Sequence, residues 1–227
     1  MKHEMSSRLT ASVATLALLS IPSAQAEERG IYVGASYGGT DYGQSVAKFD
    51  DPPDNFAPGS IIFGTVDNKD NGWSLVAGYR LGRYFALEGG WTNLGEVTFR
   101  GKTDGSGGLY ECPGGSSAPC DVTVTSETDG LFIVGVGILP LGHFGLLGQL
   151  GLYDRKSDFR VEDGRPGAFE AGTDSTETVY GLGVEYRFDR GPTIRIEWER
   201  YTGIVTIFNK ADVDYFSAGL VYQLTRK

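Results

Sequence analysis

After residue 26 the sequence has no long uninterrupted apolar run, and therefore no segment able to cross a membrane as a helix. The one such run, residues 9–21, is about 13 residues long, whereas a membrane-spanning helix needs roughly 20. Lys2 and Arg8 precede this run, and Ala24-Gln25-Ala26 follows it as a small-x-small cleavage site. We therefore expect residues 1–26 to be a signal peptide and residues 27–227 to form one exported domain, either soluble or a β-barrel.

Histidine and basic residues are also scarce. The expected mature chain has a single histidine, His143, in a short predicted turn, which argues against an acyl hydrolase with a histidine beside a serine near the outer rim. Without Lys2, Arg8 and Glu4 the mature chain has 18 basic and 28 acidic residues and a net charge of −10. This charge argues against nucleic acid as a partner. The sequence predicts no catalytic residue, metal ligand or cofactor.

Cysteine occurs only twice, at Cys112 and Cys120, in a Gly-, Ser- and Pro-rich segment. In an exported chain we expect these residues to be oxidised to a local disulfide. The bond would close a loop of about nine residues, for which the chain-entropy contribution is roughly 2 to 3 kcal/mol. A metal site built on the two cysteines is the alternative, but no histidine lies nearby.

Glycine, phenylalanine and tyrosine are abundant, with 34, 12 and 12 residues, which indicates many short strands. The clearest pattern is residues 179–201, two alternating runs around a tight turn. The apolar side of this predicted hairpin contains Tyr180, Leu182, Val184, Tyr186, Phe188, Ile194, Ile196 and Trp198. Its other side contains Gly181, Gly183, Glu185, Arg187, Arg195, Glu197 and Glu199. An aromatic-rich face opposite a charged, glycine-containing face is typical of a strand between lipid and a narrow polar lumen. A soluble eight-stranded barrel, the alternative, would have its apolar face inside.

Similar alternation begins at residues 30, 73, 85 and 144, and a last alternating segment covers residues 216–224. A further strand is expected over residues 123–139, with Phe132, Val134, Val136 and Ile138 facing outward. Long polar loops are expected at residues 43–71, 101–121, 157–175 and 203–212, and they alternate with short turns. An even strand number with alternating long and short connections predicts an all-β fold, an eight-stranded antiparallel up-and-down transmembrane β-barrel.

The inward positions of this barrel contain seven charged residues of nearly balanced sign. They are Arg80, Glu88, Glu185, Arg187, Arg195, Glu197 and Glu199. An eight-stranded barrel has little room beyond its packed side chains, and buried charges must pair. We therefore expect a lumenal salt-bridge network that closes the barrel. A switchable plug that passes small ions is the alternative.

Several motifs resemble the transmembrane domain of outer-membrane protein A and its small-barrel relatives. They are Gly-Val-Glu-Tyr at 183–186, Arg-Ile-Glu-Trp at 195–198, Ala-Leu-Glu-Gly-Gly-Trp at 86–91 and the closing Ala-Gly-Leu-Val-Tyr-Gln-Leu. The resemblance covers most of the mature chain and implies a lumenal network of Glu88, Glu185, Arg195 and Glu197. The predicted strand over residues 123–139 lacks the family's basic residue, so Arg187 or Arg80 would have to replace it. The chain also ends at Lys227 without the family's peptidoglycan-binding domain, so wall anchoring is not implied.

The leading hypothesis is a structural protein of the outer membrane, in contact with lipid and lipopolysaccharide, whose four long loops form the cell surface. A narrow ion-conducting pore, an adhesin or receptor with an unknown ligand on the loops, and an enzyme are the alternatives. Loop composition indicates exposure but identifies no ligand.

Overall fold

The computed structural model describes residues 29–44, 61–104, 112, 119–163, 169–205 and 210–224. The expected signal peptide lies outside these residues. Within them the chain forms the strands β1 (Gly30–Asp41), β2 (Ile61–Asp67), β3 (Lys69–Arg80), β4 (Phe85–Thr103), β5 (Cys120–Leu141), β6 (Phe144–Glu162), β7 (Phe169–Arg187), β8 (Thr193–Val205) and β9 (Lys210–Gln223). No helix in this part of the chain is long and apolar enough to cross a membrane.

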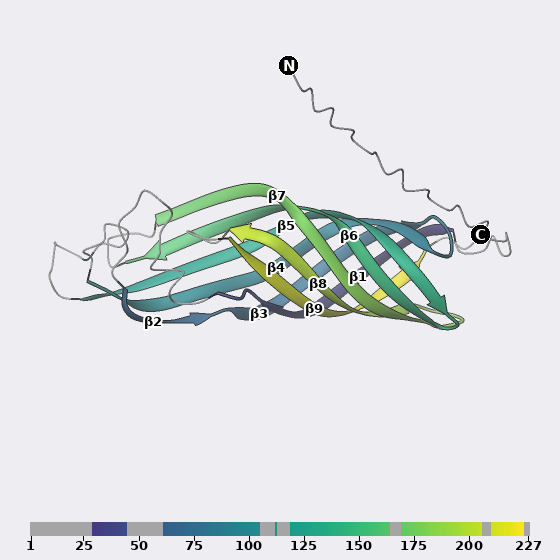
Figure 1. Ribbon diagram of the computed structural model, residues 1–227, viewed down its shortest axis with the longest axis horizontal. Coiled ribbons are helices and arrows are strands. Elements are labelled where there is room, and N and C mark those ends of the chain that lie inside the picture. Colours follow the sequence, from purple (N-terminus) through teal and green to yellow (C-terminus); the bar gives the residue numbers. More distant parts are fainter. Residues whose placement is uncertain are drawn as a thin grey trace, which may run out of the picture.

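Eight of these strands form a closed antiparallel ring in the described part of the chain (Figure 1). The order is β4-β3-β1-β9-β8-β7-β6-β5, and pairing between β5 and β4 closes the ring. The remaining strand, β2, pairs with β4 and continues the line of β3. This arrangement confirms the predicted eight-stranded up-and-down barrel.

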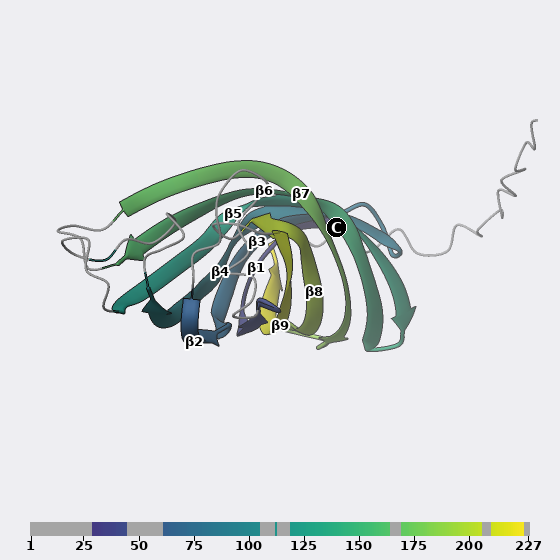
Figure 2. The same ribbon diagram turned by 60° about the vertical axis from the view of Figure 1, so that its left-hand side comes forward.

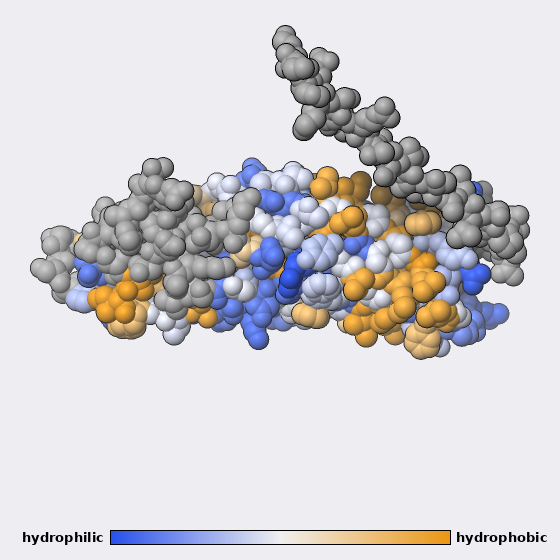
Figure 3. Space-filling view, in the orientation of Figure 1, coloured by the Kyte–Doolittle hydropathy of each residue, from blue (hydrophilic) through white to orange (hydrophobic). Residues whose placement is uncertain are grey.

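Large apolar side chains are exposed on the outside of the barrel, in a band beside the short turns. Figure 3 shows them gathered over that end of the molecule, next to a hydrophilic zone. The band ends, on the side away from the turns, at Tyr37, Trp73, Trp91, Leu131, Leu152, Tyr180 and Phe216. Five of these seven residues are aromatic, as expected where a barrel wall leaves the hydrocarbon region.

The predicted orientation of β5 is wrong. Val134, Val136 and Ile138 are buried and Phe132 lines a lumenal cavity, whereas Leu131 and Ile133 are exposed. Pairing sets this orientation, because Glu88 is paired with Val134 and paired residues share a face. Residues 131–139 are all apolar or glycine, so alternation could not distinguish the two faces.

The strands are also longer than predicted, and they continue into all four expected loops. β2 and the start of β3 lie within residues 43–71, β4 and β5 extend into residues 101–121, β6 and β7 extend into residues 157–175, and β8 and β9 extend into residues 203–212. Outside the membrane both faces of a strand can be polar, so the apolar alternation stops while the backbone ladder continues. The four expected loops are therefore shorter than the sequence suggested.

The extended strands form a sheet beyond the apolar band, which we call the protruding sheet: β2 with residues 92–103, 120–130, 153–162 and 169–179 (Figures 1 and 2). Its inner face has its own buried cluster of Phe99, Val122, Val124 and Val161. A disulfide joins Cys112 and Cys120 with a Cα–Cα distance of 5.6 Å, which confirms the predicted pairing. The buried cluster and the cross-link both lie toward the distal end of the sheet.

Candidate functional site: the barrel lumen

Four charged side chains form a continuous chain of contacts across the lumen. Arg80 Nη2 lies 3.1 Å from Glu185 Oε2, and Arg195 Nε lies 3.5 Å from the same oxygen. Arg195 Nη1 donates to Glu88 Oε1 at 2.7 Å, and the Tyr32 hydroxyl donates to the same carboxylate. All five side chains are buried. Since each arginine contacts a carboxylate on another strand, the contacts connect β1, β3, β4, β7 and β8 through the centre of the barrel.

Strand alternation and two glycines make room for this cluster. Gly78 is paired with Glu88, and Glu185 with Arg195, so these positions share the inner face of the wall. A Cβ at Gly78 would lie 2.3 Å from Tyr32 Cζ, and a Cβ at Gly145 would lie 2.9 Å from Glu185 Cγ. A side chain at Gly78 would overlap the Tyr32 ring, and one at Gly145 would force Glu185 to move, so glycine at both positions suits the packed lumen.

The other three predicted site residues have different surroundings. Arg187 Nε lies 3.4 Å from Glu185 Oε1, at the turn side of the cluster. Glu199 accepts hydrogen bonds from Gln149 Nε2 at 2.7 Å and from the Tyr201 hydroxyl at 3.2 Å. Glu199 therefore has neutral donors instead of an arginine. Glu197 has no hydrogen-bond or ion-pair partner among the described residues.

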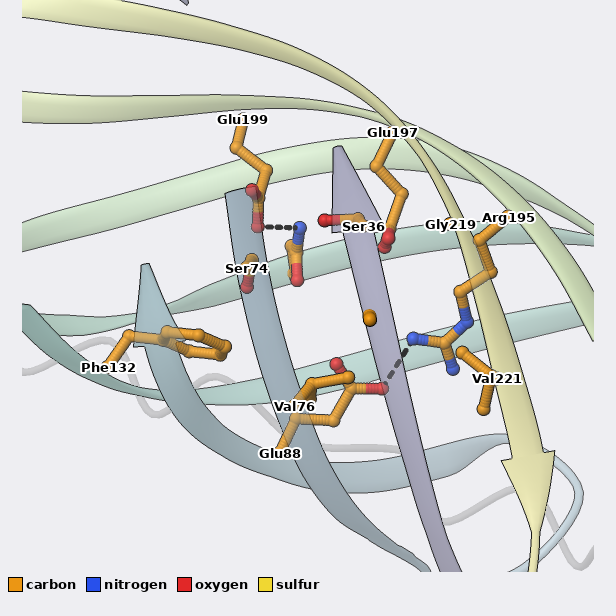
Figure 4. A pocket seen from close by; sticks show the side chains of 12 residues that line it. Ser36, Ser74, Val76, Glu88, Phe132, Arg195, Glu197, Glu199, Gly219 and Val221 are labelled. Atoms are coloured by element: carbon orange, nitrogen blue, oxygen red, sulfur yellow. Dashed lines mark hydrogen bonds and ion pairs between the residues drawn. The ribbon is translucent and has the colours of Figure 1, made fainter. Parts of the chain in front are cut away.

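A small cavity of about 20 Å³ separates the arginine cluster from these two glutamates (Figure 4). Glu197 and Glu199 lie on one side of the cavity and Glu88 on the other, with Arg195 beside Glu88. A buried water needs roughly 10 to 15 Å³ of such space, so the cavity has room for about one water molecule. It is too small to be an open channel.

Aromatic side chains fill the lumen beyond the cavity. The rings of Tyr153 and Tyr201 meet edge to face with centroids 4.8 Å apart. The Tyr153 hydroxyl donates to the Thr92 carbonyl at 3.3 Å, and the Tyr201 hydroxyl oxygen, whose proton goes to Glu199, lies 3.3 Å from Thr92 Oγ1. Tyr42 donates to the Gly95 carbonyl at 2.8 Å. The lumen is thus blocked at two levels, by charged pairs near the turns and by hydrogen-bonded tyrosines farther out.

The neutral members of this arrangement were missing from the predicted site. Tyr32, Gln149 and Tyr153 fall on inward faces by alternation, and that is the signal by which they could have been found. The contacts of Tyr153 with Thr92 and Tyr201 could not have been found in this way, because these residues come from strands far away in sequence. Among the described residues no group of three or more His, Cys, Asp or Glu side chains is placed to hold a metal ion.

The family model for the outer membrane protein beta-barrel domain matches residues 11–223. No curated protein sequence matches the chain significantly. The solved structures that match the chain at low identity include the following three. Neisserial surface protein A is 14% identical, with 86% of this chain and 97% of that chain covered and a TM-score of 0.45. Ail of Yersinia pestis, in complex with the heparin analogue sucrose octasulfate, is 12% identical, with 86% and 99% covered and a TM-score of 0.43. The N-terminal β-barrel domain of Pseudomonas aeruginosa OprF is 9% identical, with 86% and 100% covered and a TM-score of 0.41.

Proposed function

The chain belongs to the outer membrane protein beta-barrel domain family and is an integral outer-membrane protein, and we propose that it is a closed membrane anchor that presents the protruding sheet at the cell surface. In barrels of this kind the short turns face the periplasm and the long connections face outward. The turns after β3, β5 and β7 therefore lie inside, and the protruding sheet lies outside.

The observation that carries this proposal is the length of β4–β7 beyond the apolar band. About ten residues of each of these strands continue past Trp91, Leu131, Leu152 and Tyr180. A strand that only had to cross the membrane would need roughly 9 to 11 residues in all. The additional length has a buried core and a disulfide, so a surface role accounts for it better than barrel stability does.

The packed lumen supports the anchoring role over a transport role. Among the described residues, the two packed levels and a cavity for about one water favour a closed lumen over a continuous path for ions. A narrow pore is the second candidate. It is supported by the carboxylates of Glu88, Glu197 and Glu199 around the cavity, which would favour cations if the arginine pairs separated.

Two measurements test the proposal. Purified protein in planar bilayers is expected to show no steady conductance, and a steady conductance of the wild type would favour the pore. A single cysteine at Thr125, on the outer face of the protruding sheet, should react with a membrane-impermeant maleimide on intact cells. The matched cysteine at Asp189, in the turn after β7, should stay unlabelled. The reverse labelling pattern would contradict the proposed orientation.

A further inference from the structure

Two glycines lie side by side on the lipid-facing wall of the barrel, close to the short turns. Gly137 of β5 is paired with Gly148 of β6, and the same row continues to Phe85 on β4 and Leu182 on β7. Neighbouring strands are about 4.8 Å apart, so the backbones of Phe85 and Leu182 are separated by roughly 14 Å. Both of these side chains are 63% exposed, and the row between them has no side chain.

A shallow hollow of about 530 Å³ lies over the two glycines. We call it the glycine trough: Gly137 and Gly148 form its floor, and Tyr84, Phe85, Leu139, Leu146 and Leu182 form its walls. Tyr84 belongs to the turn after β3, so the trough runs from the turn-side rim into the apolar band. Its walls are apolar and it faces the membrane, so its shape and polarity fit hydrocarbon.

Neither glycine of the floor is required by the fold. A Cβ at Gly137 would have Gly148 O as its nearest neighbour at 3.7 Å, and a Cβ at Gly148 would have Leu182 Cδ2 at 3.8 Å, both ordinary contacts. Neither residue has a positive φ, and the pairing has no register shift here. Gly145 on the same strand differs, because Glu185 fills the space beside it. Glycine inside a strand often marks a place where a ligand comes close to the backbone.

A cation lies at the rim end of the glycine trough. The guanidinium carbon of Arg83 lies 5.9 Å from the centroid of the Tyr84 ring, which lines the trough. Arg83 forms no ion pair with any residue that the structure describes. The turns after β3 and β5 lie at the same end of the barrel (Figure 1), and they contain Arg83 and His143 but no Asp or Glu. This part of the rim is therefore positively charged, although the chain as a whole is acidic.

A cation, an aromatic ring and an apolar trough follow one another from the rim into the membrane, which is the order of the parts of a phospholipid. We propose that the glycine trough binds an anionic phospholipid, with an acyl chain over Gly137 and Gly148 and the headgroup phosphate at Arg83. A guanidinium group donates paired hydrogen bonds to phosphate, and basic side chains at a membrane surface favour anionic lipid. The choice of phospholipid rests on the proposed orientation, which places the trough in the periplasmic leaflet.

A second copy of the chain is the competing occupant. A two-fold dimer within a membrane has its axis along the membrane normal, so both copies place the same residues at the same depth. Contact through the trough would set one glycine pair against the other and bring two Arg83 side chains together. The hollow would then lack contact atoms and the like charges would repel, so a lipid fits the trough better.

NMR line broadening by a nitroxide-labelled lipid tests the site. The full-length mature protein in phosphatidylcholine nanodiscs receives a small fraction of phosphatidylglycerol or phosphatidylcholine, each with the nitroxide near the start of an acyl chain. The measured ratio compares the broadening of the Leu146 amide signal, in the trough, with that of Leu220 on β9, in the opposite wall. We expect a ratio about five-fold higher with phosphatidylglycerol, the contribution of one arginine near anionic lipid.

Two results with the wild type would overturn the proposal. Equal ratios for the two lipids would show that Arg83 does not select the headgroup. An unbroadened Leu146 signal with both lipids is the result expected if a second copy covers the trough.

Variants separate the headgroup contact from the trough. Arg83→Gln, at an exposed turn position, should lower the phosphatidylglycerol ratio to the phosphatidylcholine value. Gly137→Leu with Gly148→Leu fills the trough and should make the broadening equal on both walls. The matched control is Gly135→Leu, the same change on the same face of β5 outside the trough, which should behave as the wild type does. An undiminished lipid preference in Arg83→Gln or in the leucine pair would refute the site, and Arg83→Gln decides alone if the leucine pair does not fold.

The nanodisc measurement does not depend on how the barrel is oriented in the cell. Reversed maleimide labelling of Thr125→Cys and Asp189→Cys would contradict the proposed function and leave the lipid preference in place. Equal lipid ratios would leave the labelling pattern and the silent bilayer in place. The two proposals therefore fail separately.

Discussion

Arg195 is the residue on which the lumenal contacts converge. It is 2% exposed and lies within ion-pair distance of both Glu88 and Glu185. A buried ion pair adds little to stability relative to apolar packing, but removing one partner leaves an uncompensated charge. Without Arg195, Glu88 and Glu185 would both lose an ion-pair partner inside the barrel. That the contacts act as one coupled network stays a prediction.

The first prediction tests this coupling. Arg195→Ala should lower the free energy of unfolding by about 3 to 5 kcal/mol, because two carboxylates lose their shared cation. Arg195→Ala with Glu185→Ala should cost less than the two single changes added, by about 0.5 to 3 kcal/mol. Urea titration of the protein in lipid vesicles measures both quantities. Arg195→Ala with Asp129→Ala, a residue outside the lumen, is the additive control. Additivity of the first pair would contradict the lumenal network.

Asp214 supports a second prediction, at the outer border of the apolar band. Arg200 donates two hydrogen bonds of 2.7 Å to its carboxylate, and Trp198 Nε1 donates a third at 3.1 Å. The Arg200 hydrogen bonds lower the pKa of Asp214 below its ordinary value, against the opposing effect of burial. The group therefore stabilises the fold above the pKa of the unfolded chain, near 4, and this stability is lost as pH falls through the folded pKa.

Asp214→Asn should accordingly unfold more easily than the wild type at pH 7. The difference should shrink below about pH 4, where the wild-type carboxylate begins to take up its proton. Denaturant titrations at a series of pH values check this, with Asp189→Asn as a control at an exposed position. A difference that is the same at pH 7 and pH 2.5 would show that the charge of Asp214 does not contribute.

At the scale of elements, β5 is the strand whose inward and outward faces are the reverse of those predicted from the sequence. The outward positions include Gly135, where an added Cβ would have Leu150 O as its nearest neighbour at 3.9 Å. The inward Gly151 on β6 differs, because a Cβ there would lie 1.9 Å from Ile133 O. Similar glycines on adjacent strands thus have opposite tolerance to substitution.

The third prediction follows from this contrast. Gly135→Leu should leave the unfolding free energy within about 0.5 kcal/mol of the wild type or raise it, since the new side chain enters lipid. Gly151→Ala should lower it by about 1 to 3 kcal/mol through overpacking. Unfolding in vesicles compares the two variants. If Gly135→Leu proves as damaging as Gly151→Ala, the lipid-facing assignment of Gly135 is wrong.

At the scale of the whole molecule, the barrel and the protruding sheet are two parts of one continuous set of strands. The ring is closed by β4 and β5 near the membrane, whereas β8 and β9 end earlier and leave the protruding sheet open. Closure removes strand edges where lipid cannot hydrogen-bond to them. Water can satisfy an open edge outside the membrane, so the same strands can present one there.

The fourth prediction concerns export of this molecule. We expect the mature protein to begin at Glu27 and to appear in the outer-membrane fraction, because Ala24-Gln25-Ala26 ends the expected signal peptide. Intact-mass spectrometry of fractionated membranes measures both. A product that retains residues 1–26, or one recovered in the soluble fraction, would contradict the expected processing.

The sequence by itself determined the barrel, its short turns and the faces of most strands. Alternation is a local property: Tyr180, Leu182 and Val184 must share a face whatever their neighbours are. The same rule placed Arg80, Glu88, Glu185 and Arg195 inside. The disulfide could also be predicted, because both cysteines lie in one short segment of an exported chain.

Only the tertiary structure decided which residues meet. Alternation assigns a residue to a face, but the register of eight strands around a closed ring decides that Arg195 contacts Glu88 and that Tyr32 joins them. β5 needed its partner for orientation, because both of its faces are apolar. The protruding sheet was missed for a different reason. Its apolar alternation is limited to a few inner residues such as Val122, Val124 and Val161, and only backbone pairing between distant segments reveals the sheet.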